Sequence, residues 1–177
     1  MTPNSPRVWA KESTAAVRKP RRARGRTTVR KRSRGEARRV AAASSKRNHI
    51  ITSAVEHPAV TEVCHFMETQ GFEITILPVD SSGLVSPEDL QSALSPDTLL
   101  VSIMHANNEV GTIQPIQTLA ELAHESGALF HTDAAQSVGK IPVNVDELDV
   151  DLLSIAGHKL YAPKGVGALY IRRGTRL

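Results

Sequence analysis

From His49 to the end of the chain, short apolar runs alternate with segments that begin near a proline and end near a glycine. The apolar runs are rich in β-branched residues, as strands covered on both faces are. Proline and glycine in these places mark where helices begin and end. Strands that alternate with helices of about a dozen residues need crossover connections. The alternation therefore predicts an α/β fold in which a mostly parallel sheet is flanked by helices.

The predicted elements follow one another closely along the chain. Strands are expected over residues 49–55, 73–79, 98–104, 128–133, 150–155 and 166–171. Helices are expected over residues 58–70, 86–94 and 115–127. In the second helix, Ser86 precedes Pro87 and two acidic residues, a pattern typical of a helix N-terminus. The first helix carries one apolar stripe, made of Val60, Val63, Phe66 and Met67.

The charge of the chain divides at residue 48. Residues 1–48 hold 16 of the 22 Lys and Arg and only two acids, whereas residues 49–177 hold six Lys and Arg and 16 acids. The basic segment has almost no large apolar side chains, so it cannot bury enough surface to offset the entropy of ordering. We therefore predict a disordered basic arm over residues 1–48 and a folded α/β domain over residues 49–177.

Three roles for the basic arm stay open. The first is a solvated tail, or sequence translated upstream of the true coding region. The second is a mitochondrial or plastid targeting segment, because such segments are rich in Arg and poor in acids. The third is an arm that binds nucleic-acid phosphates. The arginine run lacks the interleaved aromatic residues with which single-strand binders stack on bases, so a tail is favoured over nucleic acid.

Cysteine use and hydropathy restrict the compartment. The single cysteine, Cys64, excludes an intramolecular disulfide and favours a reducing compartment, with the cytoplasm as the first expectation. No apolar run approaches the roughly 20 residues that a membrane-spanning helix needs. We therefore expect no membrane among the partners, and nucleic acid stays the least favoured role of the basic arm.

Polar and titratable residues follow several of the predicted strands. His57 follows the first strand, "HANNE" (105–109) the third, "TDAAQ" (132–136) the fourth and "AGHK" (156–159) the fifth. The carboxyl ends of parallel strands meet at one edge of a sheet, where ligands bind. Each residue alone has a structural explanation, such as a helix cap, a turn former or a lysine that reaches water. Together they predict one site.

Pyridoxal phosphate chemistry needs this combination of side chains. A lysine held out of water can form a Schiff base with an aldehyde. A carboxylate keeps the pyridine nitrogen protonated, so that the ring can accept electrons from a substrate carbanion. A flat side chain stacks on the ring, and amides donate to its phenolic oxygen. These groups are supplied in turn by Lys159, Asp133, His57, Asn108 and Gln136. We expect Lys159 to be shielded from water.

Four segments carry a family resemblance: "SAVEHPAV", "LLVSIMHANNEVGTIQPI", "HTDAAQSVGKIPV" and "LLSIAGHKLYAPKGVGALYIRRG". Through them, residues 49–177 resemble the central part of the cysteine desulfurase and selenocysteine lyase family, the NifS-like members of the class V aminotransferase group. The resemblance implies that residues 49–177 are part of the large domain of a fold-type I transferase that depends on pyridoxal 5'-phosphate. It implies no metal.

The resemblance also implies roles for individual residues. Lys159 would hold the cofactor as a Schiff base and later move protons. His57 would stack on the pyridine ring and act as an acid or base, and Asp133 would pair with the ring nitrogen. Asn108 and Gln136 would contact the phenolic oxygen.

At the phosphate of the cofactor, the sequence departs from the family pattern. His158 would lie at the phosphate, but Ala156 stands where many desulfurases carry a hydroxyl group that binds it; selenocysteine lyases can carry an apolar residue there. A Gly- and Thr-containing phosphate loop and a C-terminal domain with a nucleophilic cysteine are absent from the 177 residues. We therefore expect a fragment. Cys64 is expected to be a buried small hydrophobe rather than the missing nucleophile.

The activity that the resemblance implies is conversion of L-cysteine to L-alanine and enzyme-bound sulfur, used in Fe–S cluster assembly or tRNA thiolation. Two alternatives are a selenocysteine lyase, which acts on L-selenocysteine, and an inactive truncated product. Transaminases and other β-eliminating lyases are related, but "HANNEVG" and "GHKLYAPKG" favour the desulfurase branch. The implied partners are the amino-acid substrate, a second copy of the chain in a homodimer, and a scaffold protein that accepts sulfur.

Overall fold

The computed structural model of the chain describes residues 47–176. Its elements, in chain order, are β1 (His49–Ser53), α2 (Pro58–Thr69), β2 (Glu73–Leu77), α3 (Pro87–Ala93), β3 (Thr98–Ser102), α4 (Ile116–Glu125), β4 (Leu129–Asp133), β5 (Leu152–Ala156), the 3-10 helix η1 (Gly157–Leu160) and β6 (Gly167–Ile171). Each predicted strand and helix is present, with small differences at its ends. The short helix η1 was not predicted. The disordered arm was predicted over residues 1–48. Residues 1–46 of it lie outside the described residues, and Arg47 and Asn48 are described.

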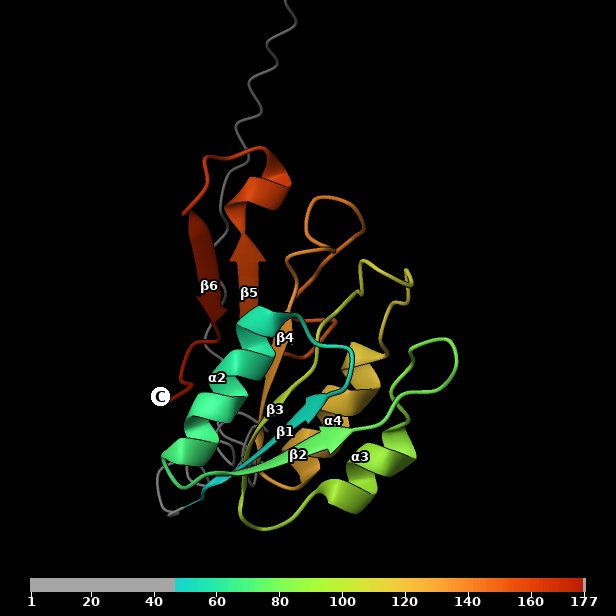
Figure 1. Cartoon of the computed structure of the whole chain (residues 1–177), viewed down its shortest axis with the longest axis vertical. Coiled ribbons are helices and arrows are strands. Elements are labelled where there is room, and N and C mark those ends of the chain that lie inside the picture. The colour runs from blue at the N-terminus through green and yellow to red at the C-terminus, as the bar shows by residue number, and fades with distance from the viewer. Residues whose placement is uncertain (1–46, 177) are drawn as a thin grey trace, which may run out of the picture. The chain divides into compact units, whose positions relative to one another are not determined.

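The strands of the described residues form one six-stranded sheet in the order β2-β1-β3-β4-β5-β6 (Figure 1). All neighbouring pairs from β2 to β5 are parallel, and β6 alone runs antiparallel, beside β5. The predicted α/β class with a mostly parallel sheet is therefore confirmed. Because β1, β3, β4 and β5 are parallel, their carboxyl ends share one edge of the sheet.

Local sequence sets where the helices begin. Helix α2 has Pro58 at its first position and is capped by the His57 side chain. Helix α3 is capped by Ser86, whose hydroxyl oxygen accepts hydrogen bonds from the backbone N–H groups of Glu88 and Asp89 at 3.1 and 3.2 Å. Both caps satisfy N–H groups that have no partner within the helix. The caps fix the loops that precede the two helices. The loop before α2 contains His57.

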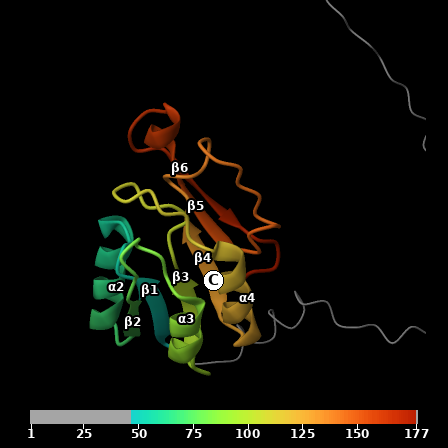
Figure 2. The same cartoon turned by 90° about the vertical axis from the view of Figure 1, so that its right-hand side faces the viewer.

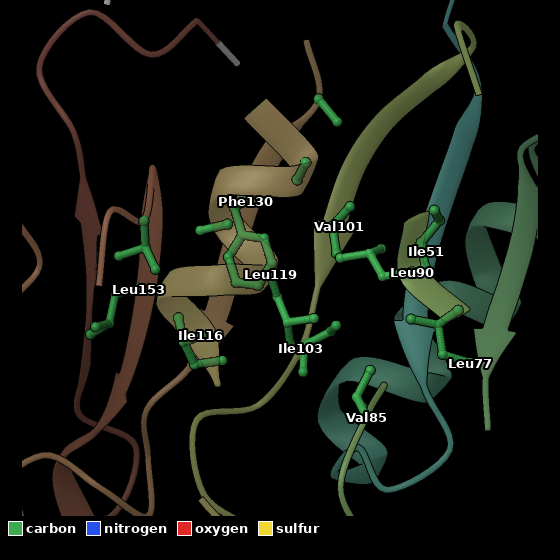
Figure 3. Packing of buried hydrophobic residues seen from close by; sticks show 14 of the residues in the cluster. Ile51, Leu77, Val85, Leu90, Val101, Ile103, Ile116, Leu119, Phe130 and Leu153 are labelled. Atoms are coloured by element: carbon green, nitrogen blue, oxygen red, sulfur yellow. The ribbon is translucent and has the colours of Figure 1, made fainter. Parts of the chain in front are cut away.

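The helices lie on both faces of the sheet. Figure 2 shows α2 on one face and α3 and α4 on the other. The main core fills the space between the sheet and the α3–α4 layer, where Ile51, Val101 and Phe130 from three neighbouring strands are fully buried with Leu90 and Leu119 from the helices (Figure 3). This packed layer fixes the strands whose carboxyl ends carry the predicted site.

The opposite face of the sheet is less covered. Of the residues of α2, only Cys64 is buried, whereas Val63 and Phe66 are 56% and 60% exposed. The apolar stripe predicted on this helix therefore does not face the core of the described residues. Cys64 is buried, as predicted, and burial, followed by the negative charge of Glu56, raises the pKa of its thiol. A raised pKa lowers the thiolate fraction and argues against a nucleophilic role.

Candidate functional site

A pocket of about 290 Å³ lies at the carboxyl edge of the sheet. Its wall is formed by side chains that follow or end β1, β3, β4 and β5. The lining residues are His57, Ala59, Met104, Asn108, Asp133, Ala135, Gln136, Ser154, Ile155, Ala156, His158 and Lys159. All six residues predicted for the site are among them. The structure therefore brings together, in one pocket, residues that lie up to about a hundred positions apart in the chain.

Lys159 and His158 enter the pocket from η1, which continues directly from β5 at the top of Figure 1. The helix ends at Tyr161, whose φ of 62° lies in the left-handed region and turns the chain back toward β6. The side chains of His158 and Lys159 are exposed in the described residues. The prediction that Lys159 is shielded from water is therefore wrong for this structure. The reason is its place: η1 lies beyond the sheet edge, and β6, its neighbour, is itself largely exposed.

Asp133 is the last residue of β4 and is half-buried. One carboxylate oxygen, Oδ1, accepts a hydrogen bond from the backbone N–H of Ala135 at 2.9 Å. Its second oxygen, Oδ2, has no hydrogen bond from residues 47–176. The negative charge of Asp133 contributes to raising the pKa of Glu56 and opposes the lowering of the pKa of His131. The pocket therefore contains a fixed carboxylate with one oxygen available to a cationic ligand group.

His57 has two roles in the structure. Its Nδ1 accepts a hydrogen bond from the backbone N–H of Ala59 at 3.1 Å and so caps α2. Because Nδ1 accepts, the proton of the neutral ring lies on Nε2. The exposed ring also lines the pocket. The same side chain therefore caps a helix and lines the pocket.

The two consecutive asparagines have different places. The Asn107 side chain holds the loop, because its Nδ2 donates to the Val55 carbonyl at 3.0 Å and its Oδ1 accepts from the backbone N–H groups of Glu109 and Val110. Asn108 is exposed and lines the pocket. Asn107 is therefore the turn former, and the Asn108 amide stays available to a ligand.

Gln136 lines the pocket from the loop after β4. Its amide oxygen accepts a hydrogen bond from the Lys140 ammonium group at 2.9 Å. This contact orients the side-chain amide so that its NH₂ group remains a donor. A donor of this kind suits an anionic or phenolic oxygen.

Below the pocket, a row of hydrogen bonds crosses three strands. His131 on β4 contacts the Ser102 hydroxyl on β3 through Nδ1 and the Ser154 hydroxyl on β5 through Nε2, both at 2.8 Å. Burial lowers the pKa of His131, so the neutral ring is favoured. Ser154 lines the pocket but was not predicted. The signal was present in "SIAGHK", because a serine near the carboxyl end of β5 must lie close to the site edge.

The lining residues fit pyridoxal phosphate. They offer a primary amine, a carboxylate with an available oxygen, an imidazole ring held by a cap, and two side-chain amides. Among residues 47–176, no group of three or more His, Cys, Asp or Glu is arranged to hold a metal ion. In the same residues, no helix combines the length and the apolar character needed to span a bilayer.

Comparison with known proteins identifies the family. The aminotransferase class-V family model matches residues 34–176. The cysteine desulfurase IscS of Dictyoglomus turgidum is 67% identical over 136 residues, which cover 77% of this chain and 34% of that protein. The IscS of Methanosarcina thermophila is 54% identical over 132 residues, 75% of this chain and 33% of that protein. The chain therefore spans about a third of the length of these relatives.

Solved structures agree with the sequence matches. A structure titled SspA in complex with cysteine superposes with a TM-score of 0.70 at 42% identity, covering 79% of this chain and 42% of that one. A NifS-like protein superposes with a TM-score of 0.71 at 41% identity, covering 80% of this chain and 41% of that one. The curated relatives described above are named cysteine desulfurases, and the chain belongs to the aminotransferase class-V family.

Proposed function

We propose that the full-length protein is a cysteine desulfurase that depends on pyridoxal 5'-phosphate, and that this chain forms the ring-binding half of its site. The observation that supports the proposal is the pocket that Lys159 and Asp133 line together with His57. When bound, pyridoxal phosphate supplies an electron sink for a carbanion at the α-carbon of an amino acid. The remaining chemistry depends on the side chains that hold the ring and move protons.

Six of the lining residues have a proposed task. The Lys159 amine would hold the cofactor through its aldehyde and would carry protons. The Asp133 carboxylate pairs through Oδ2 with the protonated ring nitrogen. The ring of His57, held by its helix-capping bond, lies against one ring face. Asn108 and Gln136 donate to the phenolic oxygen, and His158 contacts the phosphate.

The substrate proposed is L-cysteine, which yields L-alanine and enzyme-bound sulfur for Fe–S clusters or tRNA thiolation. The matched relatives are named cysteine desulfurases, and one similar structure holds cysteine, so sulfur is favoured over selenium. A second copy of the chain and a sulfur-accepting scaffold protein belong to the proposal for the full-length protein. A cytoplasmic location is proposed from cysteine use, although a similar desulfurase of Arthroderma benhamiae, 54% identical over 134 residues, is named mitochondrial.

The proposal is tested by adding pyridoxal phosphate to the purified full chain. We expect the absorbance band of lysine-bound cofactor in the wild type and its loss in Lys159→Ala, because only the amine of Lys159 lines the pocket among the lysines that the structure describes. Lys164→Ala is the matched control, since Lys164 is also exposed, lies in the loop after η1 and does not line the pocket.

Two results would contradict the proposal: no band in the wild type, or an undiminished band in Lys159→Ala. If the wild type shows the band, a second assay measures release of alanine from cysteine. Release that depends on Lys159 indicates an active chain, whereas no release indicates a truncated product that binds the cofactor without turnover.

A further inference from the structure

Glu56 is a buried carboxyl group immediately before His57, in the loop between β1 and α2. Its side chain is 9% exposed and does not line the pocket. One oxygen, Oε1, accepts two hydrogen bonds of 2.7 Å, from the Ser53 hydroxyl and from the backbone N–H of Met104. The other oxygen, Oε2, is buried without a hydrogen-bond partner among residues 47–176. A carboxyl group in this position is costly to bury, and the sequence alone gave no role for it.

The two donors come from the ends of neighbouring strands of the sheet. Ser53 ends β1, and Met104 follows β3, its neighbour in the sheet. Met104 lines the pocket itself, and Asn108 lies four residues further along the same loop. Glu56 belongs to the loop that carries His57. Its hydrogen bond from Met104 therefore joins this loop to the loop that carries Asn108.

The surroundings of Glu56 favour its neutral form. Burial, with a smaller contribution from the charge of Asp133, raises its pKa to about 7, although the hydrogen bonds from Ser53 and Met104 act in the opposite direction. A neutral carboxyl group still accepts both hydrogen bonds through Oε1 while Oε2 carries the proton. The link between the loops does not depend on a negative charge, and Asp133 remains the carboxylate that faces the pocket.

We propose that Glu56 is a positioning residue, which holds His57 and Asn108 at a fixed separation by accepting hydrogen bonds from Ser53 and Met104 on one oxygen. It acts on the cofactor only through these two loops. The inference deepens the proposed function and depends on it for the identity of the ligand, but the link between the loops can be tested without any ligand.

The first experiment is hydrogen exchange of the full chain, measured by mass spectrometry. In Glu56→Ala we expect exchange about tenfold faster in peptides over residues 54–60 and 103–109, because both loops lose their shared partner, and unchanged exchange in α4. Glu56→Gln keeps an oxygen that accepts both bonds, so its exchange should resemble the wild type. Glu62→Ala, which removes an exposed carboxylate from α2, is the control.

The second experiment measures the Kd for pyridoxal phosphate. We expect Glu56→Ala to raise the Kd about tenfold, as loss of one or two modest hydrogen bonds would, and Glu56→Gln to restore it. If Glu56→Ala does not fold, Ser53→Ala removes one of the two donors and should show a smaller change in the same direction.

The outcomes separate the two proposals. The positioning role would be overturned if both loops of Glu56→Ala exchanged at the wild-type rate. The same result in Ser53→Ala would overturn it where that variant replaces Glu56→Ala. Faster exchange spread evenly over all elements would overturn it as well. An unchanged Kd in a variant whose loops exchange faster would also overturn it. A wild-type chain that gives no absorbance band would refute the proposed function, while the exchange comparison would still decide the role of Glu56.

Discussion

Burial of Glu56 makes the stability of the protein depend on pH in a direction opposite to that of most carboxyl groups. Its pKa rises from an ordinary 4.5 to about 7, mainly through burial. Between these values the folded protein keeps a proton that the unfolded chain has lost. The stability that Glu56 contributes is therefore fully present below pH 4.5 and is lost as the pH rises through 7. The whole effect amounts to at most about 3 kcal/mol.

We predict that Glu56→Gln removes this loss. Its free energy of unfolding, measured in denaturant, should gain on the wild type by up to about 3 kcal/mol between about pH 5 and about pH 8. Burial lowers the pKa values of His105 and His131, so these residues cost stability as the pH falls below 6.5. Because both variants contain them, their effect cancels in the difference. A difference that stays constant with pH would contradict the prediction.

At the scale of elements, η1 depends on a close approach between two backbones. The N–H of Gly157 donates to the Val166 carbonyl at 2.8 Å, and the Gly157 carbonyl accepts from the N–H of Ala162 at 3.1 Å. A Cβ on Gly157 would lie 2.6 Å from the Val166 oxygen. Backbone atoms cannot move aside as a flexible side chain can, so any larger residue must displace η1 together with His158 and Lys159.

We therefore predict that Gly157→Ala lowers the free energy of unfolding by about 1–3 kcal/mol, the usual cost of overpacking. It should also weaken pyridoxal phosphate binding at least about tenfold, because the lysine moves with the helix. Gly165→Ala is the matched control: it adds a methyl group to the loop after η1, where nothing lies within 4 Å, and costs only the strain of its φ of +85°. Equal binding by the two variants would show that η1 tolerates the methyl group.

The elements that could be predicted from the sequence are those with strong local signals. Pro58 and Ser86 mark the beginnings of helices because they act on the backbone next to them. The short helix η1 lacks such a signal, since its formation depends on the contact between Gly157 and Val166 in space. The exposure of Lys159 and Phe66 was not predictable either. A sequence pattern shows that a side chain suits burial, but only the arrangement of neighbouring elements decides whether a partner covers it.

The six predicted residues line one pocket for a different reason. Asp133 and Lys159 stand at the ends of consecutive parallel strands, and parallel topology alone brings such ends to one edge. Glu56 and Ser154 were missed because neither has a motif of its own: their place follows from contacts with Met104 and His131 in neighbouring strands.

At the scale of the whole molecule, two residues of the predicted basic arm contact the elements that the structure describes. Arg47 belongs to the basic segment by composition, yet its Nη1 donates to the carbonyls of Thr98 and Gly127 at 3.1 and 2.8 Å. Asn48 accepts from the backbone N–H of Glu73 at 2.8 Å and donates to the Gly71 carbonyl at 3.2 Å. These contacts join the chain before β1 to the loops at the amino ends of β2, β3 and β4.

We predict that the contacts of Arg47, rather than the positive charge of the segment, contribute to the stability of the domain. Arg47→Ala in the full chain should lower the free energy of unfolding by roughly 1–3 kcal/mol, because a charged donor shared between two carbonyls is lost. Arg39→Ala removes the same charge from the basic segment and should leave it unchanged. Thermal unfolding of both variants measures the difference. By the same measurement, deletion of residues 1–48 should lower the stability, whereas deletion of residues 1–46 should not. Equal losses in Arg39→Ala and Arg47→Ala would mean that the positive charge itself is responsible. The basic segment would then stabilise the domain through long-range attraction to the 16 acids of residues 49–177.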